Sequence, residues 1–437
     1  MRRYGTNITY TKKRSIDMSV SAFKNDGSRR VAVIGGGAAG MMAAIFAAQS
    51  RADVALFEKN DRLGKKLRIT GKGRCNVTNE CGINDFLQNV PTNPRFLYAA
   101  LSRFEPADTM EFFEGCGVKL KVERGRRVFP VSDKAQDIVG ALADKCREVG
   151  VTVINRKISS LCIEDGQIVG VNDGQHTHEC DAVIVCTGGK SYPQTGSDGD
   201  GYKFARQAGH TVTPLTPSLV PIVADTPVCA RMQGLSLKNV TLKIVDTQNG
   251  KPVFEDFGEM MFTHFGITGP LVLSASAHIP DIQKGRYTAR IDFKPALDTQ
   301  MLDARILSDF QKYQNKDFIN AMGDLLPLKA IEPVIEKSGI DKRKKVNSIT
   351  REERKNLVAA IKEFDVPLLR FRPIDEAIVT KGGVAVNEIT PKTMQSRLVS
   401  GLYFAGEVLD LDAYTGGFNL QIAFSTAVLA GESAAQW

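Results

Sequence analysis

Residues 30–58 read RVAVIGGGAAGMMAAIFAAQSRADVALFE. An apolar run, a glycine turn, a helical apolar segment and a second apolar run follow one another, and this order predicts a β-α-β unit. The turn fits G-x-G-x-x-G: Gly35 permits the tight turn, Gly37 lets the backbone approach a pyrophosphate, and Gly40 lets the helix pack closely on the strand. We therefore expect a dinucleotide whose phosphates face the N–H groups and positive dipole end of this helix.

The end of the second strand indicates which nucleotide binds. Glu58 stands there, 23 residues after Gly35. A carboxylate at this place accepts hydrogen bonds from both ribose hydroxyls of an adenosine. It would repel a 2′-phosphate, so NADP is not expected as the resident nucleotide.

The C-terminal region favours FAD over NAD. The apolar run GLYFAGE at 401–407 is expected to return to the same sheet and to place Glu407 near the ribityl chain. Residues 416–421 (GGFNLQ) then open the last helix, whose N–H groups are expected to face the N1–O2 edge of a flavin. Because a reduced flavin is anionic at that edge, a helix N-terminus would stabilise it.

The pattern of apolar and polar residues changes in the middle of the chain. From about residue 213 to 300, strand-like pieces such as VTLKIVD and RYTARIDF alternate with turns, which indicates a β-rich insert. Residues 301–366 are polar, with apolar positions at helical spacing, and indicate a small helical subdomain. The architecture expected is a dinucleotide domain built from two separated pieces, with an insertion between them.

The charge is distributed unevenly. Residues 1–30 carry eight basic and two acidic groups, which is +6 of the net +8 of the 437-residue chain. We expect a disordered leader there, with an RNA-seeking arm as the alternative, and we leave open whether translation starts at Met1 or Met18. The leader lacks the apolar run of a secretory signal, and no stretch of about 18 apolar residues predicts a membrane span.

Cysteine and histidine usage predicts no disulfide framework and no metal. The eight cysteines form no C-x-x-C pair, so a reducing cytoplasm is the expected location. Of the five histidines, His176 and His178 stand beside a Gly-Asp turn without a matching ligand set, and we expect them at the surface.

Five blocks of sequence resemble the BaiN/RdsA-type (HI0933-like) flavoproteins, a family of NAD(P)/FAD-dependent oxidoreductases. They are VIGGGAAGMMAA at 33–44, LGKKLRITGKGRCNVTN at 63–79, CTGGKSYPQTGSDGDGY at 186–202, GEMMFTHFGITGP at 258–270 and GLYFAGEVLDLDAYTGGFNLQIA at 401–423. The resemblance spans about 30–437. It implies an α/β fold: a Rossmann-like FAD-binding domain of the glutathione-reductase type, with an inserted β-barrel and a small helical domain.

The expected divisions follow from that resemblance and from the texture of the chain. They are a basic tail (1–29), a first FAD-binding part (30–212), the barrel (213–300), the helical insert (301–372) and a second FAD-binding part (373–437). The residues expected to bind FAD are Gly35, Gly37, Ala38, Ala39, Gly40, Glu58, Lys59, Lys66, Thr70, Gly71, Gly73, Arg74, Cys75, Asn76, Thr187, Gly188, Gly189, Gly406, Glu407, Gly416, Gly417, Phe418 and Asn419.

Two residues are candidates for the acid that protonates a substrate. Cys75 lies in a glycine-rich block, where a weak acid could stand beside the reacting atom; the alternative is a buried structural cysteine. His264 lies in the block at 258–270, where it could donate a proton; the alternative is a structural histidine. Arg74 is expected near phosphate, flavin or substrate.

The resemblance implies a flavin reduced by NADH that passes hydride to a substrate. No second G-x-G-x-x-G is present, so NADH is expected to visit the flavin without a Rossmann domain of its own. The substrates implied are a uridine of large-subunit ribosomal RNA, reduced to dihydrouridine, a steroid-like enone, or a small amine such as aminoacetone. A ribosomal-RNA-binding flavoprotein without turnover is a further alternative.

The RNA substrate is favoured by two basic clusters that could contact phosphates. They are residues 342–345 (KRKK) and a group around one loop, Lys119, Lys121, Arg124, Arg126 and Arg127. Either cluster could instead be a solvated face, and the near-neutral body of the chain counts against RNA. The sequence leaves the oligomeric state open.

Overall fold

The computed structural model describes residues 22–24, 27–224 and 227–436. Most of the expected leader lies outside these residues. Ala22 and Phe23, however, are buried against the core of the first domain, so a disordered leader that continues to residue 29 is wrong for them. The backbone N–H of Lys24 also donates a hydrogen bond to the Asp53 carboxylate.

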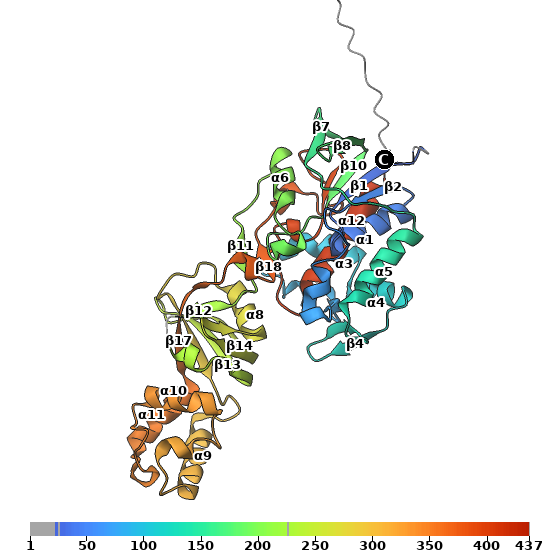
Figure 1. The fold of residues 1–437 in the computed structure, drawn as a ribbon. Helices are drawn as coiled ribbons and strands as arrows, with labels where there is room; N and C mark the ends of the chain where they lie inside the picture. The colour runs from blue at the N-terminus through green and yellow to red at the C-terminus, as the bar shows by residue number, and fades with distance from the viewer. Residues whose placement is uncertain (1–21, 25–26, 225–226, 437) are drawn as a thin grey trace, which may run out of the picture.

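A five-stranded parallel sheet forms the centre of the domain expected to bind FAD, here called the FAD-binding domain (Figure 1). The strand order is β19 (Leu402–Phe404), β10 (Ala182–Val185), β1 (Arg30–Ile34), β2 (Asp53–Phe57) and β6 (Thr152–Ile154). β1 lies in the middle, where Ile34 is opposite both Phe57 and Val185. The Rossmann-type fold is confirmed, as is the return of the C-terminal strand to this sheet.

Helices cover the sheet and complete the first core. α1 (Ala38–Gln49) follows the glycine turn and packs against α12 (Phe418–Ala434), the last helix of the chain. Gly431 permits their close approach, because a Cβ there would overlap the carbonyl oxygen of Ala43. The further helices of this domain are α2 (Ile83–Leu87), α3 (Tyr98–Arg103), α4 (Pro106–Gly115), α5 (Ala135–Glu148) and α6 (Asp200–Gln207).

Two small antiparallel sheets flank the domain. One contains β3 (Thr78–Asn79), β5 (Arg127–Pro130) and β4 (Leu120–Glu123). The other contains β7 (Ser160–Glu164), β8 (Gln167–Asn172) and β9 (Thr177–Glu179). The hairpin β4–β5 carries the expected basic loop cluster, and its turn holds Arg126 with φ 57°.

A closed six-stranded barrel is inserted into this domain, as the resemblance implies (Figure 1). Its strands in spatial order are β12 (Ile222–Ala224), β15 (Gly266–Thr268), β14 (Pro252–Thr263), β13 (Ser236–Asp246), β16 (Tyr287–Asp292) and β17 (Phe364–Phe371). β17 pairs with β12 and β16. The expected helical segment 301–372 therefore includes a strand that belongs to the barrel, because apolar residues after a helical run do not reveal their distant partners.

The helical unit is an excursion between two neighbouring barrel strands. α9 (Thr299–Lys312), α10 (Leu328–Ser338) and α11 (Arg351–Lys362) lie between β16 and β17. Local capping favours these helices: the Asp298 carboxylate accepts from Met301 N at 2.7 Å, and Thr350 and Glu353 form a capping box. The barrel and these helices share one hydrophobic core.

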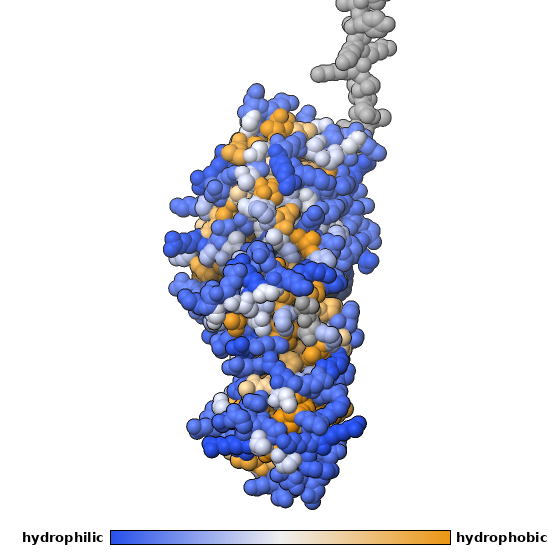
Figure 2. Space-filling model, turned by 90° about the vertical axis from the view of Figure 1, so that its left-hand side faces the viewer, coloured by the Kyte–Doolittle hydropathy of each residue, from blue (hydrophilic) through white to orange (hydrophobic). Residues whose placement is uncertain are grey.

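The three units lie in a row, which makes the molecule elongated (Figures 1 and 2). The two-stranded sheet of β11 (Thr216–Ser218) and β18 (Val379–Lys381) joins the FAD-binding domain to the barrel. α7 (Pro227–Arg231) and α8 (Pro270–His278) belong to the barrel unit. Across the described ranges, no helix has both the length and the apolar character needed to cross a bilayer.

Candidate active site

A cavity of about 1150 Å³ lies between the FAD-binding domain and the barrel. The first domain contributes the glycine turn, the end of β2, most of the segment 65–76 and the start of α12. The barrel unit contributes Glu259, Thr268, Pro270 and Leu273. One side of the cavity is therefore formed by the dinucleotide-binding motif of the first domain, and another side is formed by the inserted barrel.

In the glycine turn, two glycines allow close packing of the protein backbone, and one leaves space for a ligand. A Cβ on Gly35, whose φ is 105°, would lie 2.6 Å from the carbonyl oxygen of Cys186 on the neighbouring strand. A Cβ on Gly40 would overlap the Gly35 carbonyl. Gly37 lines the cavity, and a Cβ there would meet no protein atom within 4 Å. Space is therefore kept open at Gly37 for a ligand.

Glu58 is held in a fixed orientation at the edge of the cavity. Its Oε2 accepts from the backbone N–H of Gly36 at 2.7 Å, and its Oε1 accepts from the backbone N–H of Asn60 at 2.7 Å. The side chain is 8% exposed. Oε1 also accepts from the side-chain amide of Asn60 at 2.6 Å. Because each carboxylate oxygen has two acceptor sites, Glu58 retains one, on Oε2, for a ribose hydroxyl.

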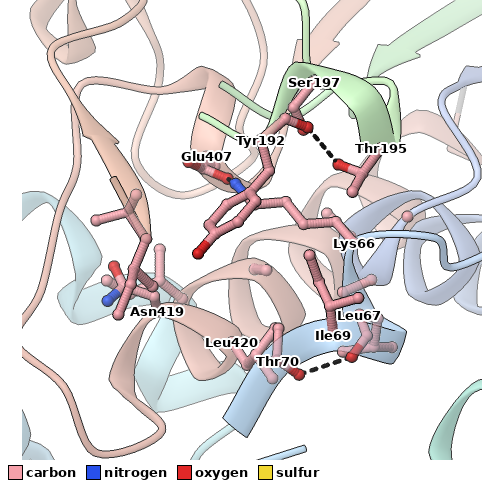
Figure 3. Close-up of a pocket in the computed structure, with 18 of the residues that line it drawn as sticks. Lys66, Leu67, Ile69, Thr70, Tyr192, Thr195, Ser197, Glu407, Asn419 and Leu420 are labelled. Carbon is pink, nitrogen blue, oxygen red and sulfur yellow. Dashed lines mark hydrogen bonds and ion pairs between the residues drawn. The ribbon is translucent and has the colours of Figure 1, made fainter. Parts of the chain in front are cut away.

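An ion pair crosses the middle of the site (Figure 3). Lys66 donates from Nζ to Glu407 Oε2 at 2.7 Å and to Ser191 Oγ at 2.8 Å. The other oxygen of Glu407 accepts from the backbone N–H of Thr380 at 3.0 Å. Lys59, near the expected adenosine end, is paired with Asp198 and Asp200. These contacts join segments that are far apart in the sequence.

The start of α12 forms part of the cavity wall, and the first N–H groups of a helix have no partner within it. Gly416 and Gly417 have φ values of 129° and 101°, and a Cβ on Gly417 would overlap the backbone of Thr78. Phe418 and Asn419 line the cavity. The Asn419 amide bonds both the N–H and the C=O of Ala413, at 3.0 and 2.7 Å, so it holds the preceding loop in place.

Two buried polar atoms in the wall have no hydrogen-bond partner within the described part of the chain. They are Asn76 Oδ1 and Thr187 Oγ1, and both residues line the cavity. Buried polar atoms are almost always paired, so these two require a partner from a ligand or from water. Together with the space at Gly37, they fit a bound flavin dinucleotide.

Five of the expected cofactor residues are not in the cavity wall: Gly40, Gly73, Cys75, Gly189 and Gly406. Three of these glycines permit close packing behind the wall, since a Cβ would crowd Gly35 from Gly40, Thr380 from Gly189 or Ala39 from Gly406. The remaining eighteen expected residues line the cavity.

The structure separates both candidate acids from the site. Cys75 is completely buried in the apolar core, and burial raises the pKa of its thiol to about 12. His264 is exposed at the turn between β14 and β15, with its ring against Phe265. Neither residue lines the cavity, so this geometry gives no support to the prediction that one of them protonates the substrate.

Arg74 lines the cavity, but its guanidinium is already engaged. It pairs with Asp133 at 2.6 Å and with Glu123, and it lies 4.2 Å from the centre of the Phe129 ring. In this arrangement it organises the wall and is not free to bind a phosphate. The sequence motif could not reveal the two carboxylates, because they come from 49 and 59 residues away.

Two tyrosines that were not among the residues expected to bind FAD, Tyr192 and Tyr414, line the wall. Tyr192 has φ 52°, and its ring extends into the cavity between Glu407 and Asn419 (Figure 3). Both tyrosines lie within blocks already singled out, 186–202 and 401–423. The motifs therefore contained both tyrosines, but the sequence did not show in which direction the two side chains point.

This fold and this site define the class of protein as a flavin-dependent oxidoreductase with a Rossmann-type FAD-binding domain. The family described as the HI0933-like protein Rossmann domain matches residues 29–433. The chain belongs to this family.

Curated relatives agree with this assignment. The chain is 33% identical over 415 residues to the 3-dehydro-bile acid delta(4,6)-reductase of Clostridium scindens, covering 93% of this chain and 99% of the relative. It is 31% identical over 400 residues to the ribosomal RNA dihydrouridine synthase of Escherichia coli, covering 90% and 95%. Among solved structures, the open conformation of a flavocytochrome c3 fumarate reductase is similar with a TM-score of 0.49, at 18% identity, covering 93% of this chain and 78% of the other.

Proposed function

We propose that the protein reduces a carbon–carbon double bond conjugated with a carbonyl group, using FAD and electrons from NADH. The names of both curated relatives support this reaction class. A uridine becomes dihydrouridine when two hydrogens add across the double bond conjugated with C4=O. A delta(4,6)-reductase that acts on a 3-dehydro compound also reduces double bonds conjugated with a carbonyl.

The residues present support FAD as the resident group. Gly37 and the N-termini of α1 and α12 would receive the pyrophosphate and the flavin edge, and the free acceptor site of Glu58 would bind a ribose hydroxyl. When bound, the flavin supplies the hydride. The protein's own part is to orient the substrate, exclude water and deliver the proton.

Ribosomal RNA is the substrate that we favour, and one observation carries this choice. Arg126 and Arg127, from the basic cluster of the β4–β5 hairpin, line the cavity and are exposed. Lys65, Lys72, Arg156 and Lys157 line the same cavity. Carboxylates pair with Arg126, Lys65, Arg156 and Lys157, so Arg127 and Lys72 are the cations of this group without an ion pair in the described ranges. Cations around the entrance of an active site would bind phosphates beside an inserted base. An enzyme of this kind would work in the cytoplasm.

The second basic cluster gives less support. In residues 342–345, Lys342 pairs with Glu332 at 2.6 Å, Lys344 with Glu353 at 2.6 Å, and Lys345 with Asp317 at 2.8 Å. These carboxylates largely neutralise the cluster. It also lies in the helical unit, at the end of the molecule away from the FAD-binding domain (Figure 1).

A small steroid-like enone is the second candidate. The observation that favours it is the apolar part of the cavity wall, where Leu219, Leu273, Ile378, Val379 and Leu411 meet. Such a surface would bury a fused ring system, as apolar ligand sites do. RNA would leave part of this surface in contact with water.

Stopped-flow mixing of the reduced protein with each substrate tests the proposal. NADH should bleach the flavin without oxygen, and an unmodified ribosomal RNA fragment should reoxidise it and gain two hydrogens by mass. Reoxidation by androst-4-ene-3,17-dione alone would favour the steroid-like substrate. A flavin that NADH does not bleach would contradict NADH-linked turnover and favour an RNA-binding flavoprotein without redox chemistry.

A further inference from the structure

The reduction needs a proton as well as a hydride, and neither Cys75 nor His264 is placed to supply it. We propose that Tyr414 donates this proton to the substrate. We further propose that His278, from the barrel insertion, orients the Tyr414 hydroxyl and returns a proton to it after the transfer. This inference rests on the proposed reduction of a conjugated double bond. It is drawn from a contact between two domains that no sequence motif indicates.

Tyr414 is placed firmly in the cavity wall. It lies in the loop before α12, four residues ahead of Phe418. Its backbone N–H donates to Asn89 O at 3.0 Å, and its carbonyl accepts from the Asn419 amide at 3.3 Å. These two bonds fix the backbone of Tyr414 beside the first turn of α12.

His278 reaches Tyr414 from the other domain. It is the last residue of α8, and its ring stacks on the Tyr414 ring with 4.6 Å between centroids and 18° between planes. Its Nδ1 lies 3.3 Å from the Tyr414 hydroxyl oxygen. Phe254 packs 5.0 Å from the histidine ring. One turn earlier on α8, Ser274 Oγ lies 3.3 Å from Thr415 Oγ1, which supports the same docking.

The surroundings of the pair favour a protonated Tyr414 phenol and a neutral His278 imidazole. Burial and the negative charge of Asp412 raise the pKa of the Tyr414 phenol, so it keeps its proton at neutral pH. Burial and then Lys381 lower the pKa of His278, although Asp256 opposes this shift. Which of the two groups donates depends on the histidine tautomer. We assign the hydrogen of the neutral histidine to Nδ1, from where it would donate to the tyrosine oxygen and leave the phenol hydrogen for the substrate.

The proton balance of the step is complete. Hydride adds to the carbon β to the carbonyl, the electron pair of the double bond moves to the α-carbon and carbonyl oxygen, and the α-carbon takes the phenol proton of Tyr414. His278 returns a proton from Nδ1 to the tyrosine oxygen as Nε2 takes one from water. His278 is half-buried, so water can reach it. Tyr192, the other tyrosine in the wall, has no comparable histidine partner in the described ranges.

Rapid-mixing kinetics under anaerobic conditions test the assignment. With androst-4-ene-3,17-dione and an unmodified ribosomal RNA fragment as probes, Tyr414→Phe should slow reoxidation of the reduced flavin by about 10²–10⁴-fold. Flavin content and the rate of flavin reduction by NADH should change less than about twofold, because neither depends on this proton. Tyr313→Phe is the matched control, since it removes an exposed hydroxyl bonded to Asp324 in the helical unit.

Two substitutions at His278 test whether its N–H group orients the Tyr414 hydroxyl or whether its ring only packs against Tyr414. His278→Phe keeps a stacked ring but loses the N–H, so it should raise the Tyr414 midpoint in an ultraviolet titration of tyrosine ionisation and lower kcat with little change in KM. His278→Asn restores a donor near Nδ1 and should recover the titration midpoint and part of kcat. Equal midpoints in all three proteins would overturn the coupling.

The outcomes distinguish this inference from the function on which it rests. Unchanged reoxidation in Tyr414→Phe, or the large loss in Tyr192→Phe instead, would overturn Tyr414 as the donor. If the reduced wild-type protein transfers hydrogen to neither probe, the proposed double-bond reduction fails, and the proton-donor role falls with it. The titration would still show whether His278 changes the pKa of the Tyr414 phenol.

Discussion

Gly37 and Gly40 are three residues apart in the glycine turn, yet their surroundings predict opposite effects of a side chain. Gly37 has φ −84°, which any residue adopts, and open space beside it. Gly37→Val should therefore fold with nearly wild-type stability but fail to retain flavin, because the side chain would occupy the pyrophosphate position. The absorbance ratio of flavin to protein measures this, and chromatography of the released wild-type flavin should identify FAD and not FMN.

Gly40→Val provides the contrast at the same turn. Its Cβ would overlap the Gly35 carbonyl, so α1 would have to move away from the sheet. Overpacking of this kind costs about 1–3 kcal/mol or more, and thermal unfolding of the apoprotein should show the loss. A fully yellow Gly37→Val protein would mean that the pyrophosphate lies elsewhere.

The β4–β5 hairpin is the element whose charge should control RNA binding. Arg126→Ala together with Arg127→Ala should weaken binding of a ribosomal RNA fragment and flatten its dependence on salt. The slope of log K against log salt should fall by about 0.7–0.9 for each phosphate that the protein no longer neutralises. Fluorescence anisotropy across a salt series measures both the affinity and the slope. Binding of androst-4-ene-3,17-dione should not change.

The helical unit offers a control with the same change in charge. Lys342→Ala together with Arg343→Ala removes two cations from the cluster at 342–345, where Lys342 is already paired with Glu332. RNA affinity should stay within about twofold, because the helical unit lies at the end of the molecule away from the FAD-binding domain (Figure 1). If this variant loses affinity and the hairpin variant does not, RNA binds to the helical unit.

At the scale of the whole molecule, two large hydrophobic cores predict two cooperative units, with a small third cluster of Leu219, Ala277 and Val379 apart from them. One core fills the FAD-binding domain, and the other is shared by the barrel and the helices. Excess FAD at about 100 times its Kd should stabilise the first unit by about 2.7 kcal/mol and raise its Tm by about 5–10 °C. The transition of the second unit should move much less. Scanning calorimetry would contradict this if one transition shifted as a whole.

The sequence alone determined the FAD-binding half of the protein, because that half is built from local motifs. Strand, glycine turn and helix at 30–49 are adjacent in the chain, and the acid at Glu58 follows at a set distance. The apolar run before Glu407 likewise predicted a strand of the same sheet, and β19 forms it. These features need only hydrophobic periodicity and the conformational freedom of glycine.

Only the tertiary structure decided which side chains share the cavity. Cys75 and His264 stand in motif blocks, but one is buried behind the wall and the other is exposed on a barrel turn. Tyr414 and His278 are 136 residues apart and meet because α8 of the insertion docks on the loop before α12. The direction of a side chain and the docking of two domains depend on contacts between distant residues. No local pattern carries that information.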